Sequence, residues 1–149
     1  MIKILFICEH NSARSQMAEA YLNHFGGDRL YGESAGLEAG ALNSYVVDAM
    51  AEEGINISHK RTKSVFDLYK SQKQFDAVIT VCSPEVSGKC PIFPGRVKRW
   101  NWPFADPSKL VGSREEILVQ MREIRDQIKT KILSFIKEYD EKGVSLFIE

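Results

Sequence analysis

The chain opens with an apolar segment that runs without a break into a polar loop and then into a helical pattern. Residues 2–7 read Ile-Lys-Ile-Leu-Phe-Ile, which is typical of a strand buried on both faces. Cys8 ends this run and begins the loop Cys-Glu-His-Asn-Ser-Ala-Arg-Ser. A helical pattern follows from about Ser12 to Phe25 and stops at a Gly-Gly pair. This order of strand, short loop and helix predicts the first unit of an α/β fold.

The same alternation continues to the end of the chain. Strands are expected at residues 2–8, 30–35, 76–82 and 97–100, and helices at 12–25, 43–53, 65–69 and from Ser113 to Gly143. The last helix is the clearest, because its apolar residues recur at steps of three and four and Ser113 with Glu116 forms a capping box. We therefore predict one three-layer domain over residues 1–149, with a four-stranded parallel sheet and helices on both faces.

The loop after the first strand has the features of an oxyanion site. The first turn of the following helix offers unpaired N–H groups and a partial positive charge, and N–H groups of the loop can form an anion-binding nest. Arg14 adds a planar fork that pairs with two oxygens of a phosphate-like group. Such surroundings favour the thiolate form of a cysteine, so we expect Cys8 to be a nucleophile under the bound anion. The expected oxyanion-binding residues are Glu9, His10, Asn11, Ser12, Ala13, Arg14 and Ser15.

The composition limits which binding partners and which cellular compartment we expect for this chain. Twenty Lys and Arg residues balance twenty Asp and Glu residues, so no overall electrostatic field favours binding to nucleic acid or to an anionic membrane. The first strand is too short for a signal peptide or a membrane span. Three cysteines without an export signal suggest a reducing cytoplasm. The Cys and His residues show no paired zinc-ligand spacing, so we expect no metal site. We also expect no tightly bound cofactor and a monomeric protein.

Two further cysteines extend the candidate site. Cys82 ends the apolar run at residues 76–82, as Cys8 ends the first, and parallel strands end along one edge of the sheet where ligands bind. Cys90 follows across a segment with Pro84 and Gly88 that looks able to rearrange. Spacing alone leaves redox involvement open, because Cys82 can equally be a core residue and Cys90 a loop residue.

An aspartate later in the chain is the candidate proton donor. Asp106 lies in the aromatic, proline-bounded stretch of residues 100–108, where we expect a raised pKa and proton transfer to a leaving oxygen. Taken alone, Asp-Pro is a routine turn. We interpret Lys60-Arg61 as a surface pair.

The segment from Ile4 to Glu19 resembles the low-molecular-weight protein tyrosine phosphatase superfamily. Residues 78–82, 90–95 and 102–107 make the chain most similar to its thioredoxin-coupled arsenate reductases, and the resemblance covers essentially the whole chain. It implies that Cys8 attacks arsenate held by Arg14, that Asp106 protonates the leaving oxygen, and that electrons pass from Cys82 and Cys90. A Cys82–Cys90 disulfide is then reduced by thioredoxin or another thiol donor. The resemblance also implies that Asn11 shapes the loop and that Ser15 donates to the sulfur.

Some relatives of this kind hold a monovalent cation near the site, and the matching positions here are Asn11, Glu19, Ser34 and, more loosely, Asp67. Members that are phosphatases carry tyrosines after the Asp-Pro pair, whereas Ser108-Lys109 follow here. An arsenate reductase acting in arsenical resistance is therefore the favoured hypothesis. The alternatives are a phosphomonoester phosphatase that uses only Cys8, Arg14 and Asp106, and a non-catalytic oxyanion or redox sensor.

Overall fold

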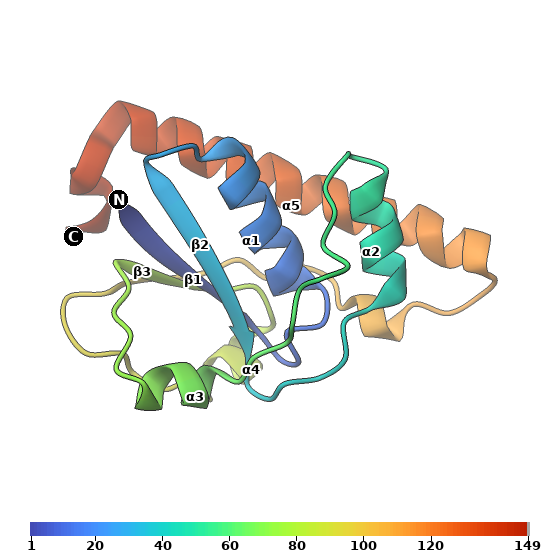
Figure 1. Ribbon diagram of the computed structural model, residues 1–149, viewed down its shortest axis with the longest axis horizontal. Coiled ribbons are helices and arrows are strands. Elements are labelled where there is room, and N and C mark those ends of the chain that lie inside the picture. Colours follow the sequence, from blue (N-terminus) through green and yellow to red (C-terminus); the bar gives the residue numbers. More distant parts are fainter. Residues whose placement is uncertain (149) are drawn as a thin grey trace.

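A parallel sheet forms the centre of the computed structural model, which describes residues 1–148. Its strands are β1 (Ile2–Cys8), β2 (Leu30–Gly36), β3 (Ala77–Thr80) and β4 (Lys98–Asn101), in the spatial order β2-β1-β3-β4 (Figure 1). Strand β1 lies between β2 and β3. Because all three strand pairs are parallel, the carboxyl end of β1 lies beside the carboxyl ends of β2 and β3. The predicted sheet is confirmed, and it brings the end of β1 to the edge where α/β folds bind ligands.

Helices cover both faces of the sheet. The helices are α1 (Arg14–Phe25), α2 (Ser44–Ala51), α3 (Val65–Lys70), α4 (Pro84–Ser87) and α5 (Arg114–Lys142), with 3₁₀ segments at Pro107–Lys109 and Gly143–Phe147. Figure 1 shows α1, α2 and the long α5 together on one side and α3 on the other. Alternation along β1 explains this division: Ile4 and Phe6 pack toward α1 and α5, whereas Leu5 and Ile7 pack toward α3.

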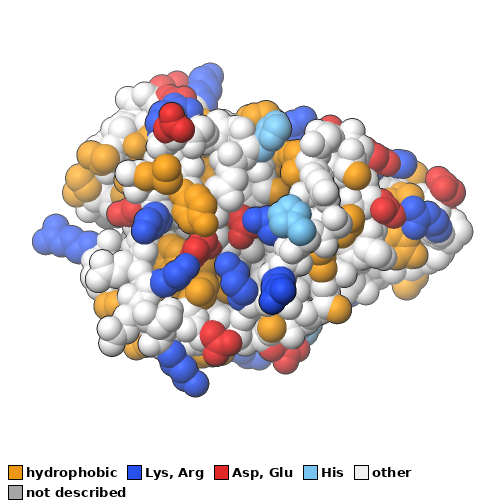
Figure 2. Space-filling model, viewed as in Figure 1, with side chains coloured by type: hydrophobic (Ala, Val, Ile, Leu, Met, Phe, Trp, Pro, Cys, Tyr) orange, Lys and Arg blue, Asp and Glu red, His pale blue; other side chains and the backbone are white. Residues whose placement is uncertain are grey.

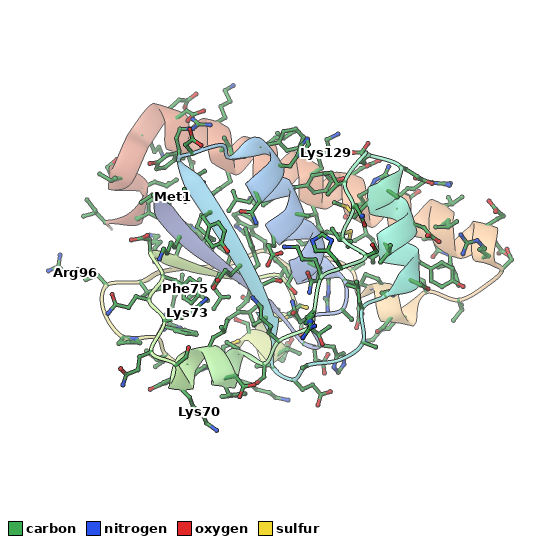
Figure 3. The ribbon with its side chains drawn as sticks, viewed as in Figure 1. Met1, Lys70, Lys73, Phe75, Arg96 and Lys129 are labelled. Carbon is green, nitrogen blue, oxygen red and sulfur yellow. The ribbon has the colours of Figure 1, made fainter. Side chains whose placement is uncertain are left out.

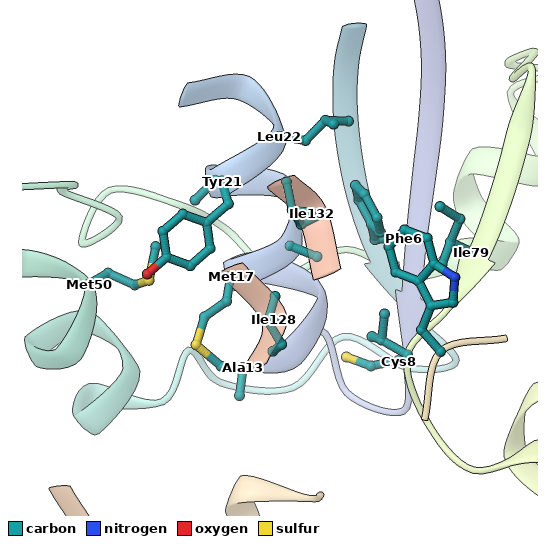
Figure 4. Close-up of a cluster of buried hydrophobic side chains, with 14 of the residues drawn as sticks. Phe6, Cys8, Ala13, Met17, Tyr21, Leu22, Met50, Ile79, Ile128 and Ile132 are labelled. Carbon is teal, nitrogen blue, oxygen red and sulfur yellow. The ribbon is translucent and has the colours of Figure 1, made fainter. Parts of the chain in front are cut away.

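The larger core lies between the sheet, α1 and α5. Phe6, Met17, Tyr21, Ile128 and Ile132 are fully buried there, and Cys8 lies at the edge of this cluster (Figure 4). The nucleophile candidate is therefore placed where a rigid strand and a packed helix meet, which restricts its motion.

The smaller core, on the α3 side, anchors the segment that contains the third cysteine. Phe93 is almost fully buried against Phe75, with ring centroids 5.6 Å apart, and Leu68 of α3 completes the cluster. Cys90 packs at the margin of this cluster.

Helix α5 begins with the predicted capping box, in which Ser113 Oγ accepts from the Glu116 N–H and the Glu116 carboxylate accepts from the Ser113 N–H. Its buried stripe includes Leu118, which the sequence pattern did not single out, whereas Ile117 is only partly buried.

The prediction was wrong at the end of the third strand and in the segment that follows it. Strand β3 ends at Thr80, so Cys82 lies two residues beyond the strand and not at its last position. The segment after it forms the short helix α4, which was not predicted and whose N-cap is Ser83. Inter-strand hydrogen bonds still continue just past this end, because Val81 donates its N–H to Ile7 O of β1 and Trp102 donates its N–H to Thr80 O.

The surface in Figure 2 shows Lys and Arg side chains interspersed with Asp and Glu, in keeping with the balanced composition. None of the helices formed by residues 1–148 is both long and apolar enough to cross a membrane.

Candidate active site

The loop between β1 and α1 has its carbonyl groups turned away from its centre. Backbone N–H groups from residues 37–43 donate to the carbonyls of Cys8, Glu9, His10 and Ser12, over distances of 2.9–3.1 Å. No side chain caps the first turn of α1, whose N-cap is Ala13. The N–H groups of this turn therefore have no acceptor in the helix and remain available to an anion.

Asn11 holds the shape of this loop. It is fully buried and adopts a left-handed backbone conformation with φ 56°, which asparagine tolerates better than most residues. Its Oδ1 accepts from the Lys63 N–H at 2.9 Å and from Gln16 Nε2 at 3.2 Å. Gly36 passes so close that a Cβ there would lie 2.6 Å from the Asn11 nitrogen. The loop is thus fixed from the segments on either side of it.

The Cys8 sulfur lies at the base of the loop and receives hydrogen bonds from two sides. The Asn11 N–H donates to Sγ at 3.2 Å, and Ser15 Oγ lies 2.9 Å from Sγ. Asn11 Nδ2 donates to Ser15 Oγ at 2.8 Å, which leaves the Ser15 hydroxyl proton free to point at the sulfur. Figure 4 shows the sulfur directed toward the start of α1. These contacts are those expected of Asn11 and Ser15, and they stabilise a negatively charged sulfur.

Arg14 joins the loop to the segment that carries Asp106. Its side chain is buried, Nη1 donates to the Phe104 carbonyl at 3.1 Å, and Nη2 lies 3.9 Å from Asp106 Oδ1. The structure therefore brings Cys8, Arg14 and Asp106 to one place, as the sequence predicted. Arg14, six residues after Cys8 in the same loop, thus links the cysteine loop to Asp106.

The expectation of a raised pKa for Asp106 was wrong. Burial raises the pKa of this carboxyl, but hydrogen bonds from the Ser108 N–H and Oγ, at 2.9 and 2.8 Å, outweigh it. The positive charges of Arg14 and Lys109 act in the same direction, so the pKa of Asp106 lies below its ordinary value. Without a ligand, Asp106 is a carboxylate at neutral pH.

Cys82 and Cys90 are both free thiols in this structure, as is Cys8. Burial raises the pKa of Cys82 to about 11; the charge of Arg14 opposes this shift and the charge of Cys8 adds to it. Burial also raises the pKa of Cys90 to about 11, and the charge of Cys82 contributes. Cys82 and Cys90 are therefore protonated at neutral pH, and Cys82 Sγ lies 4.0 Å from the carbonyl oxygen of Ile7, next to Cys8.

The remaining residues of the predicted site divide into two groups. Glu9 and Ser12 contribute backbone to the loop, whereas the His10 ring turns outward and its Nδ1 lies 2.8 Å from Glu38 Oε1. His10 therefore pairs at the surface and contributes only its backbone to the loop.

The oxygen ligands needed for a monovalent cation are not assembled here. Asn11 Oδ1 already accepts two hydrogen bonds, Ser34 Oγ donates to Glu19 Oε1 at 3.0 Å, and Asp67 is exposed on α3. Lys60 Nζ lies 2.8 Å from the other Glu19 oxygen. The resemblance implied a cation site at these positions, and their arrangement in the structure does not fit one. Across residues 1–148, no three His, Cys, Asp or Glu side chains cluster as metal ligands.

Sequence reasoning did not predict that Lys60 and Gln16 lie beside the active-site loop, and it did not predict that Glu19 is buried in an ion pair. Lys60 was interpreted as a surface residue, but its ammonium pairs with the buried Glu19. A possible signal was the spacing of Gln16 and Glu19, which lie three residues apart on one face of α1.

Known proteins resemble this chain in sequence and in fold. A family model described as low molecular weight phosphotyrosine protein phosphatase matches residues 3–145. An arsenate reductase of Shouchella clausii is 41% identical over 133 residues, covering 89% of this chain and 93% of that protein. A solved arsenate reductase in the oxidized state superposes with a TM-score of 0.75 at 27% identity, covering 93% of this chain and 98% of that chain.

A thioredoxin-dependent arsenate reductase of Corynebacterium glutamicum superposes with a TM-score of 0.60 at 27% identity, over 89% of this chain and 62% of that chain. Because the family model matches residues 3–145, nearly the whole sequence, the chain belongs to the low-molecular-weight phosphotyrosine protein phosphatase family.

Proposed function

We propose that this chain reduces arsenate to arsenite, with Cys8 as nucleophile and with Cys82 and Cys90 as the source of electrons. The observation that carries the proposal is the position of Cys82 beside the end of β1, since Cys82 Sγ lies 4.0 Å from the carbonyl oxygen of Ile7, the residue before Cys8. A hydrolase of this family needs no second thiol there. The similarity to proteins named arsenate reductase supports the same reaction.

The first step is attack on the anion. Arsenate lies over the N–H groups of residues 9–15 with Arg14 pairing two of its oxygens, and the Cys8 thiolate attacks arsenic. An oxygen leaves as water after it receives a proton. Asp106 supplies that proton, because a bound dianion next to this carboxylate raises its proton affinity above that of the empty site.

The second step transfers two electrons. The Cys82 thiolate attacks the Cys8 sulfur, a sulfur–sulfur bond forms, and the sulfur–arsenic electron pair remains on arsenic, which leaves as arsenite. Cys90 then attacks Cys82 and frees Cys8. The sum is one arsenate and two thiols giving one arsenite, one disulfide and one water.

Helix α4 determines how easily the relay proceeds. A Cys82–Cys90 disulfide needs Cα atoms within about 7 Å. Cys82 starts buried and Cys90 partly buried, and both thiols start protonated. Since α4 has only four residues and none of them is buried, unwinding it sacrifices little packing. Its movement brings the two sulfurs together and exposes them to water, where the thiolates form more readily.

Thioredoxin is the proposed reductant, and it must reach Cys90. A groove of about 700 Å³ beside this cysteine has an apolar part formed by Phe66, Tyr69, Pro91 and Pro94 and a polar part formed by Lys70, Gln72 and Gln74. Ile92 is 75% exposed next to it. An apolar surface next to a partly buried thiol suits a protein disulfide reductase that must exclude water during exchange. Ile92→Glu should raise the KM for thioredoxin several-fold and leave phosphate binding unchanged.

The test is arsenate-dependent NADPH oxidation with thioredoxin and thioredoxin reductase. Cys82→Ser and Cys90→Ser should each abolish sustained turnover and retain phosphate binding. Unimpaired turnover in the double variant would refute the relay.

A phosphomonoester phosphatase is the second candidate, because the family match and the Cys8, Arg14 and Asp106 arrangement are sufficient for it. Hydrolysis of p-nitrophenyl phosphate, measured in parallel, separates the two. A phosphatase loses hydrolysis in Cys8→Ser and keeps it in Cys82→Ser.

A further inference from the structure

Glu19 is an acidic side chain in the interior of the domain, close to the active-site loop. It lies on α1 and is only 4% exposed. A buried carboxylate is stable only when a cation or several hydrogen bonds compensate its charge. Ser34 Oγ supplies one hydrogen bond to Oε1, and the opposite charge comes from Lys60 Nζ, 2.8 Å from Oε2. The ammonium is not aligned for a regular hydrogen bond to Oε2, so the contact acts mainly through charge.

Lys60 reaches this carboxylate from a segment that also holds the active-site loop. In this segment, the Lys63 N–H donates to Asn11 Oδ1 and the Arg61 carbonyl accepts from Gln16 Nε2. The Gly36 N–H donates to the Lys63 carbonyl at 2.8 Å. The Lys60–Glu19 ion pair therefore fixes one end of residues 60–63 against α1, and the other end of the segment supports Asn11.

An unpartnered oxygen lies on the same face of α1. Gln16 Oε1 is buried and has no hydrogen-bond partner among residues 1–148, and Gln16 precedes Glu19 by three residues. Alkali cations bind buried oxygens of this kind. The carboxylate of Glu19, however, is already neutralised by Lys60.

We infer that Lys60 is a positioning residue whose ammonium takes the place of an alkali cation at Glu19, so that oxyanion binding by this chain is independent of K⁺. The inference rests on the proposed function only in using oxyanion binding as its readout. It predicts that removal of the ammonium creates a K⁺ requirement that the native chain lacks.

The decisive variant is Lys60→Met, which keeps most of the apolar stem and vacates the position of Nζ. Phosphate dissociation constants are measured by calorimetry in tetramethylammonium chloride and in KCl at equal ionic strength, since tetramethylammonium is too large to enter. The native chain should bind equally well in both, within about twofold. Lys60→Met should bind about tenfold more weakly in tetramethylammonium and recover in KCl.

Three further variants separate charge at Glu19 from general damage. Lys60→Arg keeps a cation and should behave like the native chain. Lys73→Met is the matched control, because Lys73 Nζ lies 2.7 Å from the buried Glu33 Oε1 on the α3 side of the sheet (Figure 3), and it should show no K⁺ response. In Glu19→Gln/Lys60→Met no buried charge remains, so K⁺ should no longer improve binding.

A K⁺ response in the native chain overturns the inference, and so does unaltered binding by Lys60→Met in tetramethylammonium or a loss that K⁺ does not restore. If the native chain binds no phosphate in either salt, the proposed function fails. The melting temperature then decides the inference: that of Lys60→Met should be lower than native in tetramethylammonium and rise in KCl, and equal values in the two salts overturn it.

Discussion

Replacement of Asn11 by alanine should weaken both the fold and the oxyanion site. The Asn11 side chain is fully buried and makes three hydrogen bonds, to Ser15 Oγ, Gln16 Nε2 and the Lys63 N–H. Each contributes about 0.5–1.5 kcal/mol net, and the Lys63 N–H loses its acceptor. Alanine is also less tolerant than asparagine of the left-handed backbone at φ 56°. Together these effects predict a loss of about 2–4 kcal/mol.

Urea unfolding measures this loss, and for a domain of this size it corresponds to a midpoint lower by about 1–2 M. Phosphate should stabilise the variant less than the native chain, because the loop that binds it is no longer held from Lys63. Asn11→Gly separates the two causes, since glycine accepts the backbone conformation but makes none of the hydrogen bonds. It should be more stable than Asn11→Ala by about 1 kcal/mol.

Asn56→Ala is the control, because the Asn56 side chain accepts only local hydrogen bonds from Ser58 in an exposed turn. It should cost less than about 1 kcal/mol. If Asn11→Ala is as stable as Asn56→Ala and binds phosphate as tightly as the native chain, the account of how this loop is held is wrong.

Three other predictions concern the neighbouring residues. Gly36→Ala should lower the free energy of unfolding, measured in urea, by more than about 2 kcal/mol, because the new Cβ would lie 2.6 Å from Asn11 N. Gly88→Ala should be nearly neutral, because no atom lies nearer than 3.6 Å to its Cβ position. Equal losses in the two variants would contradict the close approach at Gly36. Because the pKa of Cys82 is raised to about 11, its proton is held more tightly in the folded state, and the associated stability is present below pH 9 and is lost as pH rises toward 11. The native chain should thus lose about 2 kcal/mol more than Cys82→Ser between pH 8 and 11, and parallel losses would show that Cys82 ionises freely. Asp106→Asn should lower arsenate turnover about 10²- to 10³-fold, as expected for loss of a proton donor, while phosphate binds at least as tightly because a negative charge is removed; undiminished turnover would exclude Asp106 as the donor.

The two central strands, β1 and β3, were predictable because strands buried on both faces leave a continuous apolar run, whereas β2 and β4 carry a weaker signal. Residues 2–8 were predicted as a strand with the bounds that β1 has, and the capping box of Ser113 placed the start of α5. The superfamily was recognised from the cysteine loop, and the family match confirms it.

The errors come from interactions that the apolar pattern does not record, one of them local and one between distant segments. The lowered pKa of Asp106 depends on the Ser108 N–H and hydroxyl, two residues away, which donate hydrogen bonds to the carboxylate. The pairing of Lys60 with Glu19 spans forty-one positions of the chain, and no local pattern indicates it. Sequence reasoning placed the nucleophile but not the residues that hold its surroundings.

A single-turnover experiment on Cys90→Ser tests the central claim most directly. This variant cannot resolve the first disulfide, so one equivalent of arsenate should yield one equivalent of arsenite and one Cys8–Cys82 disulfide, identified by mass spectrometry of the quenched and digested protein. Arsenite should not form in Cys82→Ser under the same conditions. If Cys90→Ser binds arsenate but keeps both thiols and releases no arsenite, Cys82 is not the electron donor and the account is wrong.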